Sequence, residues 1–307
     1  MAVAFRHEAG TYRGADEFVG LTTAFLARAV RTGEPALVLV DADRAERLRA
    51  ALGDVPTVDY RDIRSVGRNP ALVLPTLVDF IEANAGARAL WGVGEPLWPE
   101  RSSFEVAECH QQEALLNAAL AAEPTFHLLC PVDAGALAPH IVDASLQCHP
   151  WLRDPGGLRA NADYRPADPA GLLAEPLSPP PGAAAVFDFT ADDLHELRRR
   201  VGALAAAVGF AADRADDLVL AVDEVATNTH RHGGGRGTLV TWRSNGWLVC
   251  EVRDAGRFTD PMVGRRAPAS RQLGGRGLWI ANQICDVVQV RSSDDGAVVR
   301  MYTRTGT

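Results

Sequence analysis

The sequence predicts two domains of different architecture, an α/β domain with a parallel sheet followed by an α+β sandwich. Over residues 1–150, short apolar runs alternate with amphipathic segments, which is typical of a parallel sheet covered by helices on both faces. Over residues 186–307, two helical segments precede a series of strands, which is typical of helices packed on one face of a mixed, largely antiparallel sheet. Residues 151–185 between them are rich in Pro, Gly and Ala, and this composition predicts an extended linker.

The elements of the first domain are predicted from hydrophobic periodicity. Residues 16–32 repeat apolar side chains with a helical period, and Gly33 is a typical helix end. Ala36–Val40 is a compact apolar run with the length of a buried strand. The same alternation continues, with helices expected at 43–52, 71–84, 104–122 and 136–148 and strands near 57–60, 88–93 and 126–130.

The second domain contains clear start and turn signals. Thr190 with Asp193 three residues later is typical of a capped helix start. Asn245-Gly246 between two apolar runs is a strong signal for a two-residue hairpin turn. The expected helices are one that ends near 208 and others at 211–231 and 277–285, and the expected strands are at 186–189, 237–244, 247–254, 287–292 and 297–303.

The composition argues against nucleic-acid binding and membrane insertion. The 307 residues carry a formal net charge of −8 without a long Lys/Arg run, whereas binding to nucleic acid relies on a basic surface. No stretch of about 18 apolar residues is free of charge, and the N-terminal residues lack a signal-peptide core. The five cysteines show no C-x-x-C spacing. We therefore expect a cytoplasmic protein with reduced thiols.

Two polar residues one helical turn apart begin a candidate site in the second domain. Glu224 and Asn228 are four residues apart in the expected helix 211–231, so they share one face. By itself, such a pair is usually a solvated helix face. Its meaning therefore depends on the motifs that follow.

The second motif lies at the end of an expected strand. Asp254 can accept a hydrogen bond from an amine such as N6 of adenine, and Gly256 would let the backbone approach the ring closely. In isolation, an Asp in this position is more often the cap of an ordinary turn.

The third motif is a glycine loop directly before the last expected helix. Gly274, Gly275 and Gly277 would let the chain wrap a phosphate, which the N–H groups of a helix N-terminus bind well. Arg276 lies inside this loop and either meets the γ-phosphate or is solvated. A glycine loop alone is a weak signal, so the order of all three motifs carries the inference.

Together the three motifs resemble the ATP-binding fold shared by gyrase, Hsp90, histidine kinases and MutL, and more closely the bacterial anti-sigma factor serine kinases. The resemblance covers residues 186–307 and implies a histidine-kinase-like α/β sandwich that binds ATP with Mg²⁺. It implies that Asn228 coordinates Mg²⁺ at the phosphates and that Asp254 reads adenine. Glu224 would act as general base on a substrate serine or on water.

The sequence departs from the family pattern at two positions. Phe258 stands where the adenine motif usually has a second glycine, and Gly296-Ala297 stands where the last strand often begins with Gly-Thr. Both changes are expected to weaken nucleotide binding or slow turnover. No histidine has the surroundings of a histidine-kinase phosphorylation helix, and His230 and His232 are expected to complement the dipole of the helix that they end.

The first domain contains a set of scattered polar and aromatic positions: His7, Tyr12, Trp91-Gly92, Glu95, Glu113, Asn117 and His149-Pro150. By these positions it resembles the MEDS-type sensory domain, which implies a RecA-like α/β fold and a small-molecule signal. The chain has no G-x-x-x-x-G-K-[ST] motif, so ATP binding in the P-loop manner is not expected there.

Two Cys-His pairs in the first domain raise the question of a metal site. Cys109-His110 and Cys148-His149 are adjacent residues in or at expected helices. Because neighbours on a helix point about 100° apart, they rarely chelate one ion together. Packing or surface roles are the favoured interpretation.

The sequence thus favours a regulatory switch with two domains. The first would sense a signal, and the second would use ATP to bind a sigma factor or to phosphorylate a serine on a STAS-type anti-anti-sigma protein. A non-catalytic scaffold, in which ATP is structural or absent, is the alternative that Phe258 and Ala297 favour. A histidine kinase is a third option and would require a phosphohistidine. A homodimer is compatible with either of the first two functions.

Overall fold

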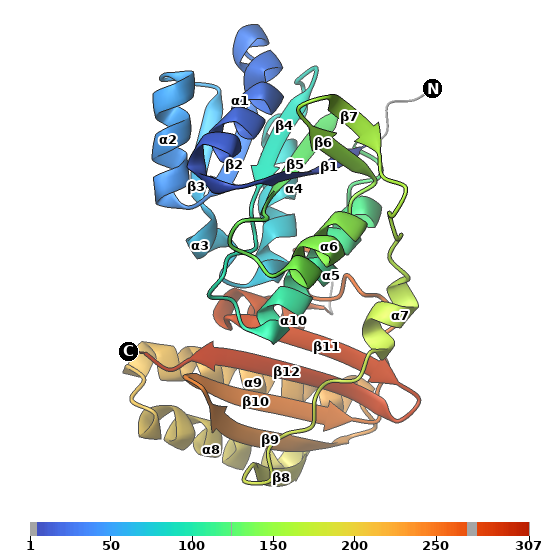
Figure 1. The fold of residues 1–307 in the computed structure, drawn as a ribbon. Helices are drawn as coiled ribbons and strands as arrows, with labels where there is room; N and C mark the ends of the chain where they lie inside the picture. Colours follow the sequence, from blue (N-terminus) through green and yellow to red (C-terminus); the bar gives the residue numbers. More distant parts are fainter. Residues whose placement is uncertain (1–4, 124, 269–274, 307) are drawn as a thin grey trace. The chain divides into compact units, whose positions relative to one another are not determined.

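The computed structural model describes residues 5–123, 125–268 and 275–306. It divides into two compact units, Met1–Ala167 and Asp168–Thr307, and each unit is built on one sheet (Figure 1). The first sheet is mostly parallel and the second is antiparallel, so both predicted architectures are confirmed. Within the described ranges, no helix combines the length and apolar character needed to cross a membrane.

The first unit contains a seven-stranded sheet with helices on both faces. Its strands are β1 (Arg6–Tyr12), β2 (Ala36–Val40), β3 (Val58–Asp62), β4 (Leu90–Gly94), β5 (Phe126–Asp133), β6 (Trp151–Asp154) and β7 (Gly157–Ala160). Its helices are α1 (Gly14–Thr32), α2 (Ala42–Leu52), α3 (Ile63–Val66), the 3₁₀ turn Pro70–Leu72, α4 (Val73–Ala83), α5 (Ser103–Ala119) and α6 (Pro139–Gln147). The strand order is β3-β2-β4-β5-β1-β6-β7, with β6 and β7 antiparallel to each other.

Strand β1 has no counterpart among the predicted elements, although it lies between β5 and β6. Its sequence RHEAGTY lacks the apolar run typical of a buried strand. The polar side chains are nonetheless buried because they have partners. Glu8 is fully buried, forms an ion pair with Arg6 at 2.5 Å, and accepts a hydrogen bond from Arg153 Nε at 2.6 Å. Burial of charge is tolerated when it is paired, and this is why hydrophobicity alone does not detect the strand.

The predicted linker 151–185 is ordered in part. Residues 151–160 form β6 and β7, and β6 extends the first sheet by pairing with β1 at Glu8 and Ala9. Pro155 and Gly156 form the turn between them, and Gly157, the first residue of β7, has a φ of 115°, a conformation that favours glycine. The composition predicted an extended spacer, whereas residues 151–160 form a short hairpin. The hairpin forms because β1, a partner distant in the sequence, supplies hydrogen bonds to β6.

The second unit contains a five-stranded antiparallel sheet in the order β11-β12-β10-β9-β8. Its strands are β8 (Ala185–Thr190), β9 (Arg236–Ser244), β10 (Trp247–Asp254), β11 (Val287–Ser293) and β12 (Gly296–Arg304). Its helices are α7 (Pro169–Ala174), the 3₁₀ turn Ala191–Asp193, α8 (Leu194–Ala207), α9 (Ala212–His232) and α10 (Arg276–Ile284). The alternate side chains Leu248, Cys250 and Val252 of β10 pack against α8, α9 and α10 in one apolar core.

Two local predictions in this unit are confirmed. The Thr190 N–H and hydroxyl both donate to Asp193, at 2.9 and 2.8 Å, at the start of the helical segment. Asn245 and Gly246 adopt φ values of 49° and 79° between β9 and β10, as a tight hairpin turn of primed type requires. The hairpin turn determines where β10 begins, and Asp254 is the last residue of this strand.

Candidate functional site

Helix α9 brings Glu224 and Asn228 to the edge of the core of the second unit. Val225 and Ala226 between them are buried in the apolar core, whereas Glu224 and Asn228 are half-buried. The spacing of four residues therefore places both polar groups on one face beside the packed face, as the sequence predicts.

The carboxylate of Asp254 is held by two hydrogen bonds at the end of β10. Its Oδ2 accepts from Thr229 Oγ1 at 2.7 Å, and its Oδ1 accepts from the Gly256 N–H at 2.7 Å. Thr229 is 1 % exposed and was not predicted as a site residue. In the sequence, Thr229 continues the helical repeat of Leu218, Val222 and Val225 on the buried face of α9, which indicates burial but does not identify Asp254 as its partner.

Two glycines allow the backbone to approach this carboxylate. A Cβ atom on Gly233 would lie 2.4 Å from Cγ of Asp254, and one on Gly256 would lie 2.8 Å from its Oδ1. Neither distance is compatible with a side chain. The sequence predicted a close approach of the Gly256 backbone to a bound base rather than to this carboxylate, and it predicted no role for Gly233, which follows the end of α9.

The first turn of α10 lies against the Glu224/Asn228 face. A Cβ atom on Gly277 would lie 2.8 Å from Asn228 Nδ2 and 3.2 Å from Glu224 Oε2. Gly275 caps the helix with a φ of 84°, a conformation that favours glycine. Arg276 is exposed. Gly274, the first glycine of the predicted loop, lies outside the described residues.

These groups surround one cavity of about 260 Å³. Asn228, Asp254, Gly256 and Gly275 line it, and Glu224 and Gly277 adjoin it through Asn228. His232, Phe258 and Ala297 also contribute to its wall. The structure therefore brings the three sequence motifs together and places both departures from the family pattern in the same cavity. Its full lining is Val225, Asn228, His232, Gly233, Asp254, Gly256, Arg257, Phe258, Val263, Gly275, Leu278, Ala297 and Val299.

Comparisons with protein families cover both parts of the chain. Residues 187–303 match the profile described as the histidine kinase-like ATPase domain. Residues 6–150 match the profile of the MEDS domain, described as the methanogen/methylotroph, DcmR sensory domain. The chain joins a MEDS domain to a histidine kinase-like ATPase domain. The first unit is called the MEDS domain and the second the ATPase domain.

Two further comparisons are less informative. A search of curated proteins gave no match. Among solved structures, the chain is similar to the RsbU and RsbW domains of Rv1364c from Mycobacterium tuberculosis, at 15 % identity and a TM-score of 0.29. That match covers 39 % of this chain and 32 % of the other chain. A similarity of this size establishes neither the activity nor the partners of the ATPase domain described above.

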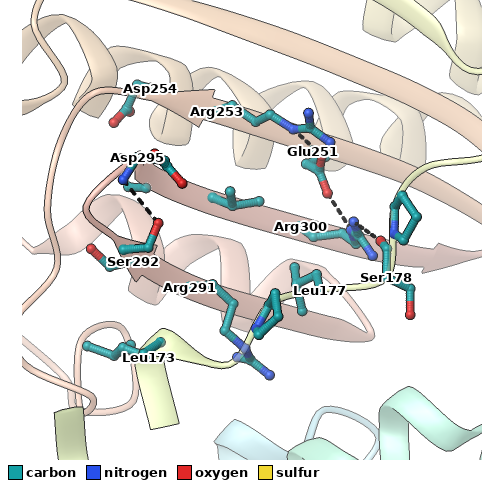
Figure 2. Close-up of a pocket in the computed structure, with 17 residues that line it drawn as sticks. Leu173, Leu177, Ser178, Glu251, Arg253, Asp254, Arg291, Ser292, Asp295 and Arg300 are labelled. Atoms are coloured by element: carbon teal, nitrogen blue, oxygen red, sulfur yellow. Dashed lines mark hydrogen bonds and ion pairs between the residues drawn. The ribbon is translucent and has the colours of Figure 1, made fainter. Parts of the chain in front are cut away.

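A second hollow lies on the face of the ATPase sheet opposite α8, α9 and α10. It has a volume of about 370 Å³ and is lined by the end of α7, residues 176–179 and the strands β10, β11 and β12 (Figure 2). Glu251 joins Arg253 and Arg300 there, and Arg300 Nη2 donates to the Ser178 carbonyl at 2.7 Å. Since Glu251, Arg253 and Arg300 are already paired with one another and with the chain segment that crosses the sheet, this hollow is a weaker candidate than the cavity beside Asn228.

The MEDS domain carries a polar cluster at the carboxyl ends of its parallel strands. Tyr12 ends β1, Asp133 ends β5, Asp41 follows β2 and Glu95 follows β4. Arg44 of α2 joins them, with Nε 2.9 Å from a Glu95 oxygen and Nη2 3.2 Å from Asp133. Tyr12 donates its hydroxyl proton to Glu95. The sequence predicted Tyr12 and Glu95 but not Arg44, which the fold brings to the same edge.

The pH dependence of stability is expected to report on Glu95. Burial raises the pKa of Glu95 to about 8 from an ordinary 4.5, aided by Asp41 and Asp133 and opposed by Arg44 and the Tyr12 hydrogen bond. Because the folded pKa exceeds the unfolded one, the protonated carboxyl contributes stability that is complete below pH 4.5 and is lost as the pH rises through about 8.

Glu95→Gln is the reference variant for this pH dependence, because the glutamine side chain does not titrate. We expect the unfolding free energy of the wild type, relative to this variant, to fall between pH 4.5 and about 8 and then to level. Urea unfolding followed across this range measures it. A difference that stays constant with pH would contradict the raised pKa.

Proposed function

We propose that the chain is an ATP-dependent regulatory switch of the anti-sigma factor type. The MEDS domain would receive a signal, and the ATPase domain would bind a sigma factor or phosphorylate a serine on a STAS-type anti-anti-sigma protein. The convergence of α9, β10 and the start of α10 on one cavity is the observation that supports this proposal most directly. Use of ATP and of such partners places the protein in the cytoplasm.

The residues around the cavity fit ATP with Mg²⁺. Gly277 lets the first turn of α10 approach Asn228 and Glu224, and Gly256 lets the turn after β10 approach Asp254, because a Cβ atom at either position would clash with those groups. These close contacts bring a helix start, suited to phosphate, and the Asp254 carboxylate, suited to a base, to one cavity. Asn228 would supply an oxygen ligand to Mg²⁺, which prefers oxygen and retains several waters. Gly275 and Gly277, with Gly274 before them, would bind phosphate through backbone N–H groups at the helix start. Arg276 would lie close to the phosphates.

Asp254 would select the base. Thr229 and Gly256 hold its carboxylate by two hydrogen bonds, and an ionised carboxylate has further acceptor sites. An exocyclic amine such as N6 of adenine is a suitable donor, whereas the carbonyl at the same position of guanine is not. ATP is therefore preferred to GTP in this proposal.

Glu224 would act as the general base. ATP supplies the transferable phosphoryl group, and Mg²⁺ neutralises its charge. The carboxylate of Glu224 lies beside Asn228 and the first turn of α10, where a substrate hydroxyl would approach the phosphates. It would accept the proton of a substrate serine as that oxygen attacks.

The alternative function is a scaffold in which ATP is structural or absent. Phe258 and Ala297 favour it, because both line the cavity in place of the family's glycine and threonine. Phe258 also packs partly against the apolar core, so it reduces the space that a base would use.

The signal of the MEDS domain is proposed to bind at the carboxyl edge of its sheet. Ligands of open α/β sheets commonly bind outside the carboxyl ends of the strands. Tyr12, Arg44 and Glu95 meet at this edge and offer both hydrogen-bond donors and acceptors. A small polar molecule would fit this chemistry better than an apolar one.

Two measurements on the full-length chain test the proposal. Calorimetry with ATP and Mg²⁺ is expected to show binding at one site, and absence of binding favours the nucleotide-independent scaffold. Labelled ATP is then supplied with candidate STAS-type proteins and sigma factors. The switch is rejected if neither acid-stable serine phosphorylation nor a nucleotide-sensitive complex forms. An acid-labile label on the chain itself would instead indicate a histidine kinase.

A further inference from the structure

Four potential metal ligands meet in the interior of the MEDS domain. His7 lies on β1, Cys130 on β5 and Glu113 on α5, and His149 follows the end of α6. One ligand atom of each lies within 4.8 Å of all the others. All four residues are at most 3 % exposed. Neither adjacent Cys-His pair of the sequence forms this group, since only His149 of those four residues belongs to it.

The hydrogen bond between His7 and Asn117 indicates which ring nitrogen of His7 carries the proton. Nδ1 of His7 lies 3.1 Å from Asn117 Oδ1, while Nδ2 of Asn117 donates to the Cys148 carbonyl at 2.9 Å. This second bond sets the orientation of the amide, so Asn117 Oδ1 can only accept a proton from Nδ1. The other nitrogen of a neutral His7, Nε2, therefore presents a lone pair to Glu113 Oε2 at 3.1 Å and to Cys130 Sγ at 3.3 Å.

His149 has the same arrangement. Its Nδ1 lies 2.7 Å from the carbonyl oxygen of Ser145, which only accepts, so Nδ1 carries the proton. Its Nε2 lies 3.0 Å from Glu113 Oε2. With the proton of each ring on Nδ1, both Nε2 atoms direct lone pairs at one carboxylate, and the Cys130 thiol is the neighbouring donor.

A cation between these acceptors makes the arrangement favourable. Two imidazolium ions could supply protons, but their ring centres are only 4.1 Å apart in a buried place, where two positive charges repel each other. A bound metal ion satisfies all the lone pairs at once.

We propose that His7, Glu113, Cys130 and His149 bind a divalent transition-metal ion, with Zn²⁺ as the best fit. Two imidazoles, one thiolate and one carboxylate are all ordinary zinc ligands, and four ligands complete a tetrahedron. Ligand atoms of such a tetrahedron lie about 3.3–3.8 Å apart. Here they lie within 4.8 Å of one another, and the Nε2 atoms of His7 and His149 are 3.1 and 3.0 Å from Glu113 Oε2. On binding, the Cys130 thiol would release its proton to solvent.

Outer contacts already hold the ligands in the required orientation. Asn117 and the Ser145 carbonyl bind the Nδ1–H groups of the two histidines, as outer partners of zinc-binding histidines do. A site with four protein ligands and no exposed side chain has the character of a structural rather than a catalytic metal site. It joins two neighbouring strands to α5 and to the end of α6.

Metal titration of the full-length chain tests the site independently of ATP. Metal-free protein is titrated with Zn²⁺ against a chromophoric chelator, and with Co²⁺ as an optical probe. We expect one equivalent of metal and an absorption band from thiolate-to-cobalt charge transfer. Asn117→Ala should weaken Zn²⁺ binding by about 10- to 100-fold, as loss of an outer partner commonly does.

Matched cysteine variants identify the ligand. Cys130→Ser should abolish the charge-transfer band, whereas Cys148→Ser, which removes a nearby thiol outside the cluster, should retain it. Circular dichroism of each metal-free variant confirms that it folds, and Glu113→Gln provides a second ligand change if Cys130→Ser does not. Failure of the folded wild type to bind Zn²⁺, or a band that Cys130→Ser leaves unchanged, overturns the proposal.

Discussion

Glu224→Ala is expected to slow phosphoryl transfer to a serine substrate by about 10²–10⁴-fold, the range for loss of a general base. The physical reason is that the attacking hydroxyl would then have no positioned proton acceptor. Glu224 Oε2 lies beside the first turn of α10, 3.2 Å from the position of a Cβ on Gly277. Single-turnover transfer from labelled ATP measures the rate, and calorimetry on the same variant measures ATP affinity.

A role as base predicts that the rate falls while ATP affinity changes little. Asp223→Ala is the matched control, because Asp223 is the preceding acidic residue of α9 and pairs with Arg198 at 2.8 Å on the surface. It should retain the wild-type rate. Glu224→Gln should resemble Glu224→Ala, since the amide keeps the shape but cannot accept the proton. A Glu224→Gln variant with the wild-type rate would remove Glu224 from the chemistry.

Asp254→Asn is expected to weaken ATP binding by about 10- to 150-fold, which corresponds to the loss of about 1.5–3 kcal/mol from a charged hydrogen bond. The amide loses one acceptor and the negative charge, and its new N–H₂ group faces the Thr229 hydroxyl or the base. Discrimination of ATP from GTP should shrink in parallel, because the carboxylate is proposed to read the exocyclic amine.

Asp188→Asn provides a matched control for this change. Asp188 accepts from Thr238 Oγ1 at 2.7 Å between β8 and β9, the same Asp–Thr pairing outside the cavity of Asn228. It should leave ATP affinity and nucleotide preference unchanged. If Asp254→Asn binds ATP and GTP as the wild type does, adenine is not read by this residue.

Local signals predicted most of the secondary structure because each rests on a few neighbouring residues. The Asn245-Gly246 turn needs two positive φ values, and the helical period of α9 needs one amphipathic segment. Strand β1 was not predicted because its side chains are polar. Their burial depends on partners 100 or more residues away in the sequence, such as Arg153 and Glu113. No local pattern carries that information.

The residues of the candidate sites also fall into those that local sequence identified and those that only tertiary contacts identified. For the ATPase domain, residue type and order were enough to name Glu224, Asn228, Asp254 and the glycine loop, because a nucleotide site uses glycines and carboxylates at characteristic element ends. Thr229 and Gly233 were missed, since their contact with Asp254 arises only when α9 packs on β10.

By itself, the sequence determined the two architectures, the elements of the second domain and the three motifs around the cavity. These depend on periodicity, turn chemistry and spacing, which are properties of short segments. The tertiary structure decided which distant polar groups meet. It placed β1 inside the first sheet, and it brought His7 and Cys130 to Glu113 and His149. Such a meeting depends on strand order and helix packing, because a side chain's partners in space are set by the register of the whole sheet rather than by its neighbours in the chain.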